Sequence, residues 1–243
     1  MKFYTSGSKK IMTMVLFWET GDKNPFFVQI LLTFNHSMCY NRVVRKAEQK
    51  LILEVFVMNV WHELNPERVT PQRFDAYIEI PKGSKSKYEL DKETGLLRLD
   101  RILHTSTRYP ANYGLIPLTF AQDLDPLDVL VLCSETVYPG ILIECYPIGY
   151  IRMIDSGYND EKIIAIPFND PNYNIYTDIS QLPPHIFREM CHFFSVYKTL
   201  EQSDKYTKVQ DVKGASEAQA IIAQAIKDYK KTYGGVLKSQ NFT

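Results

Sequence analysis

The sequence predicts a mainly β protein with flanking α-helices, an α+β fold whose strands form a closed or nearly closed barrel. Short β-rich runs recur between clusters of proline, glycine and aspartate from residue 74 onward. Two stretches with helical periodicity follow them toward the C-terminal end. A chain of 243 residues that is 45% hydrophobic is also large enough to bury a full-sized core.

The strand predictions begin with FDAYIEIP, which starts at Phe74 and alternates apolar and polar residues. The next segment, KYELDKETGLLRLDRIL, indicates two strands on either side of a turn at Gly95. Three further β-rich runs follow: DVLVLC, ILIECYPIGYIRMI and KIIAIPF. Strands this short and numerous favour a barrel.

Both predicted helices have a start signal and an apolar stripe. The first begins at PPHIFREM, where proline suits the opening turn, and the second begins with Ser216 as N-cap and Gln219 three residues later. The stripe of the first helix consists of Ile186, Met190, Phe193 and Tyr197. The stripe of the second consists of Ala218, Ile222, Ala225 and Tyr229.

The chain changes character near Met58. Residues 1–57 contain eight Lys or Arg against four Asp or Glu, a basic surplus that the remainder lacks. This extension can be a targeting segment, a small accessory element or upstream sequence ahead of a start at Met58. The last is favoured because MNVWHELNPERV, with Trp61 and His62 as anchors, is typical of an entry into a compact domain. We therefore predict an extension over 1–57, a main domain over 58–233 and a frayed tail over 234–243.

Composition excludes several classes of function. Equal numbers of basic and acidic residues, 28 of each, argue against a nucleic-acid or anionic-membrane surface. The apolar runs at 11–18 and 26–34 are shorter than the about 20 residues that cross a bilayer. Four cysteines without CxxC spacing predict free thiols in a reducing compartment, and hence a cytoplasmic protein. HSMC at 36–39 lacks the second pair of ligands that a zinc site needs.

The segment DLDPLDVLVL places Asp123, Asp125 and Asp128 within six positions, directly ahead of an apolar strand. On an extended segment Asp123 and Asp125 point the same way, and Pro126 interrupts a regular ladder so that Asp128 can turn back toward them. Like charges this close need cations, and hard ions such as Mg²⁺ prefer oxygen ligands. The pattern predicts a metal site, with a solvated acidic turn as the alternative.

Other strand ends supply further acids and bases. IRMIDSGYNDEKIIAIPF carries acids in a hairpin loop and then a lysine, and PKGSKSKYELD places Lys87 and Glu89 on one strand face, where Lys85 can instead be solvated. The full set comprises Glu79, Lys87, Glu89, Arg101, Tyr109, Tyr113, Asp155, Asp160, Glu161, Lys162, Tyr197 and Lys198. Acids that hold metals, beside Lys, Arg and Tyr that hold oxyanions, are typical of metal-assisted phosphoryl transfer.

The order of these motifs resembles the soluble family I inorganic pyrophosphatases. IEIPKGSKSKYELDKETG, LDRIL, YPANYG, DLDPLDVLV, PGILIECYPIGYIRMID and HFFSVYK match in order from near Asn59 to Leu200, and DxDPxDVLV is the most specific of them. The resemblance implies an OB-like five-stranded barrel and hydrolysis of diphosphate to two phosphates with several Mg²⁺ ions. It also implies a homo-oligomer, either a hexamer or a dimer.

The resemblance further implies a role for each site residue. Asp125 matches the general base that takes a proton from the attacking water. The implied metal ligands are Asp123, Asp128, Asp155, Asp160 and Glu89. The implied diphosphate-binding residues are Lys87, Arg101, Tyr113, Lys162, Tyr197 and Lys198, of which Lys87, Arg101 and Tyr113 also act in catalysis. Glu79 and Tyr109 match positions that support the site.

Two positions depart from the bacterial pattern. Leu124 stands where glycine is common, although plant-like members carry other residues there. Ser156 stands where an acid often follows Asp155. We expect the second change to weaken one metal site or a neighbouring contact without removing activity.

Three other functions compete with this interpretation. A barrel of this kind can bind oligonucleotides or sugars, but that surface would interleave exposed aromatics with Lys and Arg. An inactive homologue would be expected to lose some of Asp123, Asp125 and Asp128, which this chain retains. A phosphatase acting on nucleotides shares the chemistry and is disfavoured only by the resemblance.

Overall fold

The computed structural model describes residues 11–18, 26–33, 59–155, 157–201 and 207–239, with the backbone alone at 11–18, 26–33, 155, 158 and 235–239. The chain divides into two compact units, Met1–Phe56 and Val57–Thr243. None of the helices in the described ranges combines the length and the apolar character of a membrane-spanning segment.

The first unit contains a two-stranded antiparallel sheet. Strand β1 (Ile11–Trp18) pairs with β2 (Phe26–Thr33), with Ile11 opposite Thr33 and Trp18 opposite Phe26. The two apolar runs of the sequence therefore form the two strands of one hairpin. The HSMC motif lies outside the described residues.

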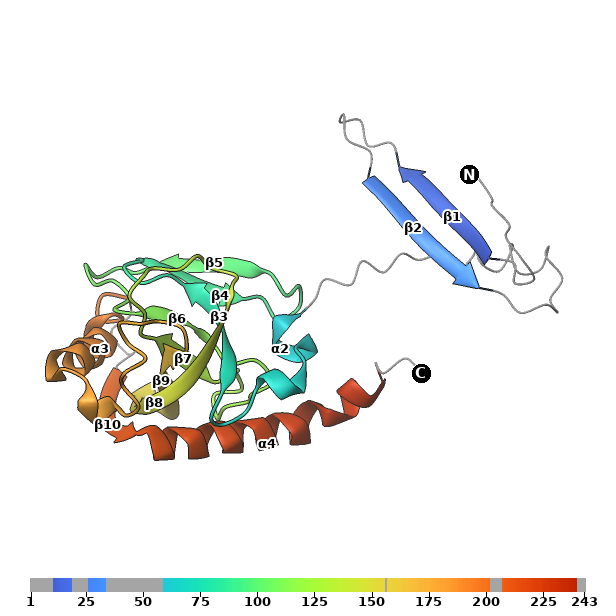
Figure 1. Cartoon of the computed structure of the whole chain (residues 1–243). Helices are drawn as coiled ribbons and strands as arrows, with labels where there is room; N and C mark the ends of the chain where they lie inside the picture. The colour runs from blue at the N-terminus through green and yellow to red at the C-terminus, as the bar shows by residue number, and fades with distance from the viewer. Residues whose placement is uncertain (1–10, 19–25, 34–58, 156, 202–206, 240–243) are drawn as a thin grey trace. The chain divides into compact units, whose positions relative to one another are not determined.

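Five strands of the second unit form a closed ring (Figure 1). The order round the ring is β8, β3, β6, β7 and β9, and β9 pairs back with β8. These strands are β3 (Phe74–Ile80), β6 (Asn112–Leu115), β7 (Asp128–Val131), β8 (Leu142–Asp155) and β9 (Tyr158–Pro167). The predicted OB-like five-stranded barrel is thus confirmed. All neighbours in the ring are antiparallel except β7 and β9, which run parallel.

The remaining strands lie outside this ring. The predicted hairpin forms a separate sheet of β4 (Ser86–Leu90) and β5 (Leu97–Ile102), and β10 (Thr207–Gly214) extends the sheet beside β8. The sequence predicted neither β10 nor β6. Strand β10 carries alternating charges and is only half-buried. A side chain at Gly114 of β6 would lie 1.9 Å from the carbonyl oxygen of Tyr77, so glycine permits the close pairing of β6 with β3.

Helices cover the outside of the ring (Figure 1). Helix α2 (Val60–Glu63) opens the unit and the 3₁₀ turn η1 (Pro66–Arg68) follows it; η2 (Ile179–Gln181) precedes α3 (Pro184–Val196). The proline start of α3 is confirmed. Its stripe packs on the barrel, with Met190 and Phe193 buried and Tyr197 buried just beyond the last turn.

Helix α4 (Ala215–Ser239) differs from its prediction at both ends. It begins one residue before Ser216, because the carboxylate of Asp178 accepts the N–H of Ala215 at 2.8 Å and caps the helix from a distant turn. At the other end it continues through Ser239, past Gly234, where the sequence predicts that the tail begins. The predicted stripe is confirmed, since Ala218, Ile222, Ala225 and Tyr229 are all buried.

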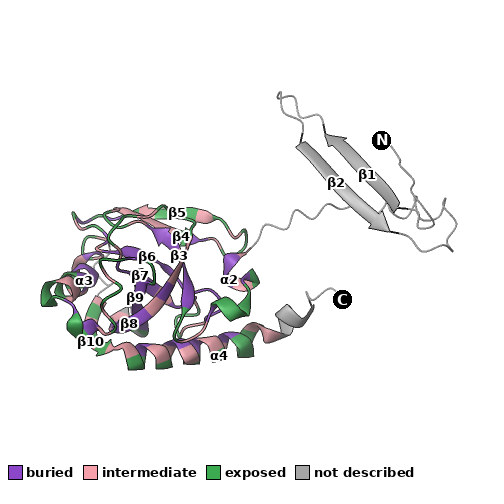
Figure 2. Ribbon diagram, in the orientation of Figure 1, coloured by how far each residue is buried: buried purple, intermediate pink, exposed green. Residues whose placement is uncertain are grey.

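The core consists of two apolar clusters on the ring strands. One joins the ring to α2 and α4, and the other joins it to α3. Figure 2 shows the buried residues concentrated in these strands, with exposed residues on the outer faces of the helices. The described cysteines, Cys133, Cys145 and Cys191, are free thiols, as predicted, and Cys39 lies outside the described residues.

Candidate active site

A cavity of about 300 Å³ is lined by residues from the ring, the β4–β5 hairpin, α2 and the end of α3. Six carboxylates line it: Glu79, Glu89, Asp123, Asp125, Asp128 and Asp160. Four lysines line it: Lys87, Lys92, Lys162 and Lys198. The cavity is therefore densely charged, with an excess of acids over lysines.

The parallel pair of strands places three charges side by side. Asp128 at the start of β7 stands opposite Lys162 of β9, and Asp160 lies two positions earlier on β9. The Lys162 ammonium contacts Asp128 and lies 2.7 Å from an oxygen of Asp160. Burial alone would lower the pKa of Lys162, but Asp128 and Asp160 raise it well above its usual value. We call Asp128, Asp160 and Lys162 the strand-borne triad.

The segment before β7 is a tight turn rather than the extended segment that the sequence predicts. The N–H of Ala121 donates to the Asp125 carbonyl at 2.8 Å, and Leu124 adopts a left-handed conformation with φ of 70°. The predicted convergence of the three aspartates still holds, because Asp123, Asp125 and Asp128 all line the cavity. The positive φ explains why glycine is common at position 124, and Leu124 is accommodated with its side chain in solvent.

Two acids of the cavity have raised pKa values. Burial, followed by repulsion from Asp128, raises the pKa of Glu79 to about 8, while its carboxylate accepts the N–H of Leu90 at 2.7 Å. Asp123 reaches solvent at the mouth, yet desolvation by the surrounding protein, with Asp128 and Asp160 nearby, raises its pKa to about 6. Both shifts indicate a site that would gain from a bound cation.

The tyrosines form the inner wall. Tyr109, Tyr113 and Tyr197 are all buried, and the Lys162 ammonium lies 5.7 Å from the centre of the Tyr113 ring. Burial raises the pKa of Tyr109 and of Tyr113 well above the usual value. Both hydroxyls therefore stay protonated at neutral pH and can donate hydrogen bonds to an anion.

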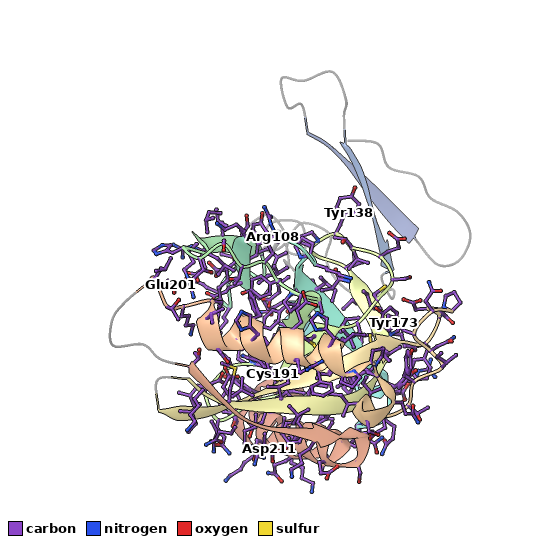
Figure 3. All side chains as sticks on the ribbon, turned by 90° about the vertical axis from the view of Figure 1, so that its left-hand side faces the viewer. Arg108, Tyr138, Tyr173, Cys191, Glu201 and Asp211 are labelled. Carbon is purple, nitrogen blue, oxygen red and sulfur yellow. The ribbon has the colours of Figure 1, made fainter. Side chains whose placement is uncertain are left out.

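Most of the predicted site residues meet in this cavity. It is lined by Glu79, Lys87, Glu89, Tyr109, Tyr113, Asp123, Asp125, Asp128, Asp160, Lys162, Tyr197 and Lys198. Arg101 is not among the lining residues. Its Nε donates to Glu201 at 2.9 Å, and its guanidinium also pairs with Asp100. Glu201, labelled in Figure 3, follows α3 and holds the Arg101 guanidinium in an ion pair.

The acids predicted in one hairpin loop lie instead on its two paired strands. Asp160 of β9 stands opposite Met153, and Glu161 pairs with Arg152 at 3.3 Å rather than lining the cavity. Asp155 is the last residue of β8, and the position of its side chain lies outside the described part of the structure, as does Ser156.

Seven lining residues lie outside the predicted site set, and two of them, Lys92 and Trp61, bear on the chemistry of the cavity. Lys92 stands five residues after Lys87 in a turn, a position where a lysine is normally solvated. Trp61 does anchor the chain, as predicted, because it is buried and its Nε1 donates to the Thr119 carbonyl at 2.9 Å. Its ring also forms part of the cavity wall, which no sequence pattern indicated.

The donor chemistry of the cavity fits Mg²⁺. Its metal-ligating groups are carboxylates, the hard oxygen donors that this ion prefers. Within the described residues no three Asp, Glu, His or Cys side chains are grouped to hold one ion. The acids are paired with lysines instead: Lys162 with Asp128 and Asp160, Lys92 with Asp125 and Lys87 with Glu89. A metal ion would take over carboxylates that ammonium groups neutralise here.

A closed five-stranded barrel with carboxylates and lysines round one cavity defines a phosphate-processing hydrolase. The profile of the inorganic pyrophosphatase family matches residues 76–230. The chain is 47% identical to soluble inorganic pyrophosphatase 2 of Chlamydomonas reinhardtii over 173 residues, which is 71% of this chain and 89% of that one. A soluble inorganic pyrophosphatase of Solanum tuberosum is 53% identical over 144 residues, which is 59% of this chain and 68% of that one.

Solved structures agree with these relatives. The inorganic pyrophosphatase of Thermus thermophilus superposes with a TM-score of 0.68 at 35% identity, covering 71% of this chain and 99% of that one. The inorganic pyrophosphatase of Helicobacter pylori superposes with a TM-score of 0.65 at 38% identity, covering 69% of this chain and 99% of that one. This chain therefore belongs to the inorganic pyrophosphatase family and is an inorganic diphosphatase.

Proposed function

We propose that the chain hydrolyses diphosphate to two phosphates in a Mg²⁺-dependent reaction in which Asp125 is the general base. The observation that carries the proposal is the single cavity with six carboxylates and four lysines. Carboxylates suit divalent cations and lysines suit phosphate oxygens, so one cavity offers partners for both components of a magnesium diphosphate complex.

The proposed metal ligands are Asp123, Asp128, Asp155, Asp160 and Glu89. Bound Mg²⁺ would lower the pKa of the attacking water and offset the charge of diphosphate. The raised pKa of Asp123, caused by desolvation and by Asp128 and Asp160, supports this assignment because a cation would remove the cost of ionising it.

The lysines change partners in this scheme. Lys162 and Lys87 are paired with carboxylates in the structure, Lys162 with the strand-borne acids and Lys87 with Glu89. With those carboxylates engaged by metal ions, the ammonium groups of Lys162 and Lys87 would be available to the phosphate oxygens of diphosphate. Charged hydrogen bonds of this kind are about twice as strong as neutral ones and stabilise the departing phosphate.

Asp125 is placed to move a proton. It lies on the turn before β7 with a half-exposed side chain, so it can reach water at the mouth of the cavity. A water with a lowered pKa gives its proton to an ordinary carboxylate, so Asp125 needs no raised basicity.

Neutral and cationic donors complete the site. Tyr113, Tyr197 and Lys198 line the cavity and are proposed to bind diphosphate, with Glu79 and Tyr109 as supporting residues. Arg101 is proposed to join them by leaving Glu201 when the anion enters.

The proposal is tested by phosphate release from diphosphate, with and without Mg²⁺, on the full chain and on a chain that begins at Met58. ATP and a phosphate monoester serve as comparison substrates. We expect fast turnover that needs Mg²⁺, is confined to diphosphate and does not require residues 1–57. Equal turnover of ATP would contradict the substrate assignment, and turnover in EDTA would contradict the metal assignment.

We further propose a cytoplasmic homo-oligomer that binds neither nucleic acid nor membranes. The free thiols support a reducing compartment such as the cytoplasm. The balanced charge supports the absence of a nucleic-acid or membrane surface. Light scattering on the full chain measures its mass, and a monomeric mass would contradict self-association.

A further inference from the structure

A lysine outside the predicted diphosphate-binding set lies in the same cavity. Lys92 stands in the turn between β4 and β5, and its ammonium pairs with Asp125. Two other cavity lysines, Lys87 and Lys162, have the same arrangement, because each pairs with carboxylates of the cavity wall. Both of those lysines belong to the predicted diphosphate-binding set. Like them, Lys92 lines the cavity and pairs with a carboxylate of its wall.

The position of Lys92 is held by the segment that opens the domain. The side-chain amide of Asn59 donates to the Lys92 carbonyl at 3.0 Å, while its oxygen accepts the N–H of Trp61 at 3.1 Å. The Lys92 ammonium lies 5.7 Å from the centre of the Trp61 ring. Because Trp61 is itself buried and bonded to Thr119, the ring is a fixed support for the cation.

The turn that carries Lys92 is also well defined. The Asp91 carboxylate accepts the N–H groups of Glu93 and Thr94, both at 3.0 Å, and Gly95 supplies a φ of 71°. The backbone of Lys92 is therefore fixed, whereas its side chain is 50% exposed. A long side chain on a fixed turn can exchange one partner for another without moving the hairpin.

We propose that Lys92, supported by Trp61, is a further diphosphate-binding residue that leaves Asp125 for a phosphate oxygen when diphosphate enters. The inference rests on the proposed function of the same cavity. A half-exposed ion pair is screened by water, so the exchange costs little. It also frees the Asp125 carboxylate to accept a proton at the moment when the substrate is in place.

The test is the affinity of the full chain for methylenediphosphonate, a diphosphate analogue that cannot be hydrolysed, measured by calorimetry at fixed free Mg²⁺. Lys92→Met is expected to raise the Kd, and the KM for diphosphate, by about tenfold, the loss of one charged hydrogen bond. Lys92→Arg keeps the cation and is expected to retain most of the affinity. Lys85→Met, in the same stretch but outside the cavity lining, is the matched control and should bind as the wild type does.

The role of Trp61 is tested by a double-mutant cycle. Trp61→Phe in the wild-type background is expected to raise the Kd by about threefold, because a weaker ring faces the cation. In the Lys92→Met background the same change should have no further effect. Equal effects in both backgrounds would show that Trp61 acts on the fold alone and would overturn its supporting role.

Binding and turnover separate this inference from the proposed function. A Kd for Lys92→Met within twofold of the wild type would overturn the role of Lys92, even if the wild type hydrolyses diphosphate rapidly. A wild-type chain that binds the analogue but releases no phosphate would overturn the proposed function and leave the Lys92 comparison valid. A wild-type chain that neither binds the analogue nor releases phosphate from diphosphate would overturn both.

Discussion

The charges of the cavity are carried in two different ways. The strand-borne triad lies on paired strands of the closed ring, and its side chains are 6% to 22% exposed. Lys92 and Asp125, which we call the turn-borne pair, lie on two turns, and their side chains are 50% and 48% exposed. The triad is largely desolvated by the barrel, whereas the turn-borne pair is half hydrated.

This difference indicates a division of labour. A charge buried on a strand needs a partner of opposite charge at every stage, whether a neighbouring side chain or a ligand, so the triad contributes to the stability of the fold. Charges on turns contribute little to stability because water screens them, so they are suited to proton transfer and to exchanging ligands. The comparison predicts that substitutions in the triad change both stability and activity, and that substitutions in the pair change activity alone.

The largest expected effect is that of Lys162→Met. The buried Asp160 and the partly buried Asp128 would be left without their cation, so the free energy of unfolding should fall by about 3–5 kcal/mol. Urea unfolding at neutral pH without added metal measures it, with Lys85→Met as the control. Adding Asp160→Asn should restore part of the loss. A fall below about 1 kcal/mol would remove the contrast between the two groups.

The second prediction concerns the other side of the comparison. Asp125→Asn should lower kcat for diphosphate by about 10²- to 10⁴-fold, because the proton acceptor is lost. The free energy of unfolding should change by less than about 1 kcal/mol, since the ion pair with Lys92 is screened. Steady-state kinetics and urea unfolding on the same preparation check both statements. Near-normal turnover would exclude Asp125 as the base.

The third prediction extends the buried group to Glu79. Its pKa is raised to about 8 by burial and Asp128, so the folded chain keeps a proton that the unfolded chain releases. The free energy of unfolding should therefore fall as pH rises from about 4.5 to about 8. Glu79→Gln keeps an acceptor for Leu90 and should reduce that fall by more than about 1 kcal/mol. Urea unfolding in EDTA at pH 5 and pH 8 measures this fall in the wild type and in Glu79→Gln. An equal fall in both proteins would refute a buried protonated Glu79.

The fourth prediction sharpens the comparison between the two lysines. Lys92→Met should change the free energy of unfolding by less than about 1 kcal/mol, although it weakens diphosphate binding. The measurement is the urea curve used for Lys162→Met. A loss similar to that of Lys162→Met would mean that turn-borne charges are as structural as strand-borne ones.

The smallest expected effect is that of Leu124→Gly in the turn before β7. Glycine relieves a left-handed backbone, worth about 1 kcal/mol, but has more freedom to lose on folding, which costs a similar amount. Stability should therefore stay within about 0.5 kcal/mol of the wild type, and kcat should be unchanged. Leu124→Val is the contrasting variant and should destabilise, because a branched side chain tolerates positive φ poorly. Thermal unfolding and kinetics test both variants, and a large gain from glycine would mean that the turn is strained.

The sequence predicted the barrel and most of the site, and its failures have identifiable causes. Strands with strong apolar or alternating patterns were found, but β6 was missed because its pairing depends on the small size of Gly114. The three aspartates were expected to meet on an extended segment, and they meet on a turn with a left-handed Leu124. The predicted convergence of the aspartates still holds, because an extended segment and a turn both lead the chain to the start of β7.

The sequence could not predict which charged side chains of the cavity pair with each other. That Lys162 contacts Asp128 follows from the register of a parallel pair, which a single chain does not reveal. Lys92 was missed because a lysine in a turn is usually solvated, and only the packing of Trp61 beneath it marks it out. Arg101 was placed in the site by resemblance, and the structure adds that it is bonded to Glu201 and does not line the cavity.

The parallel pairing of β7 with β9 has a consequence for how the protein folds. Neighbours β8 and β9 are joined by a short turn and can pair early, whereas Asp128 and Lys162 are 34 positions apart and meet only when the ring closes. A chain with an open ring has no diphosphate site. Diphosphate bound in this cavity would therefore stabilise the closed barrel alone, by an amount that rises with the logarithm of its concentration above the Kd, so the substrate of the enzyme would also act as a stabilising ligand of its fold.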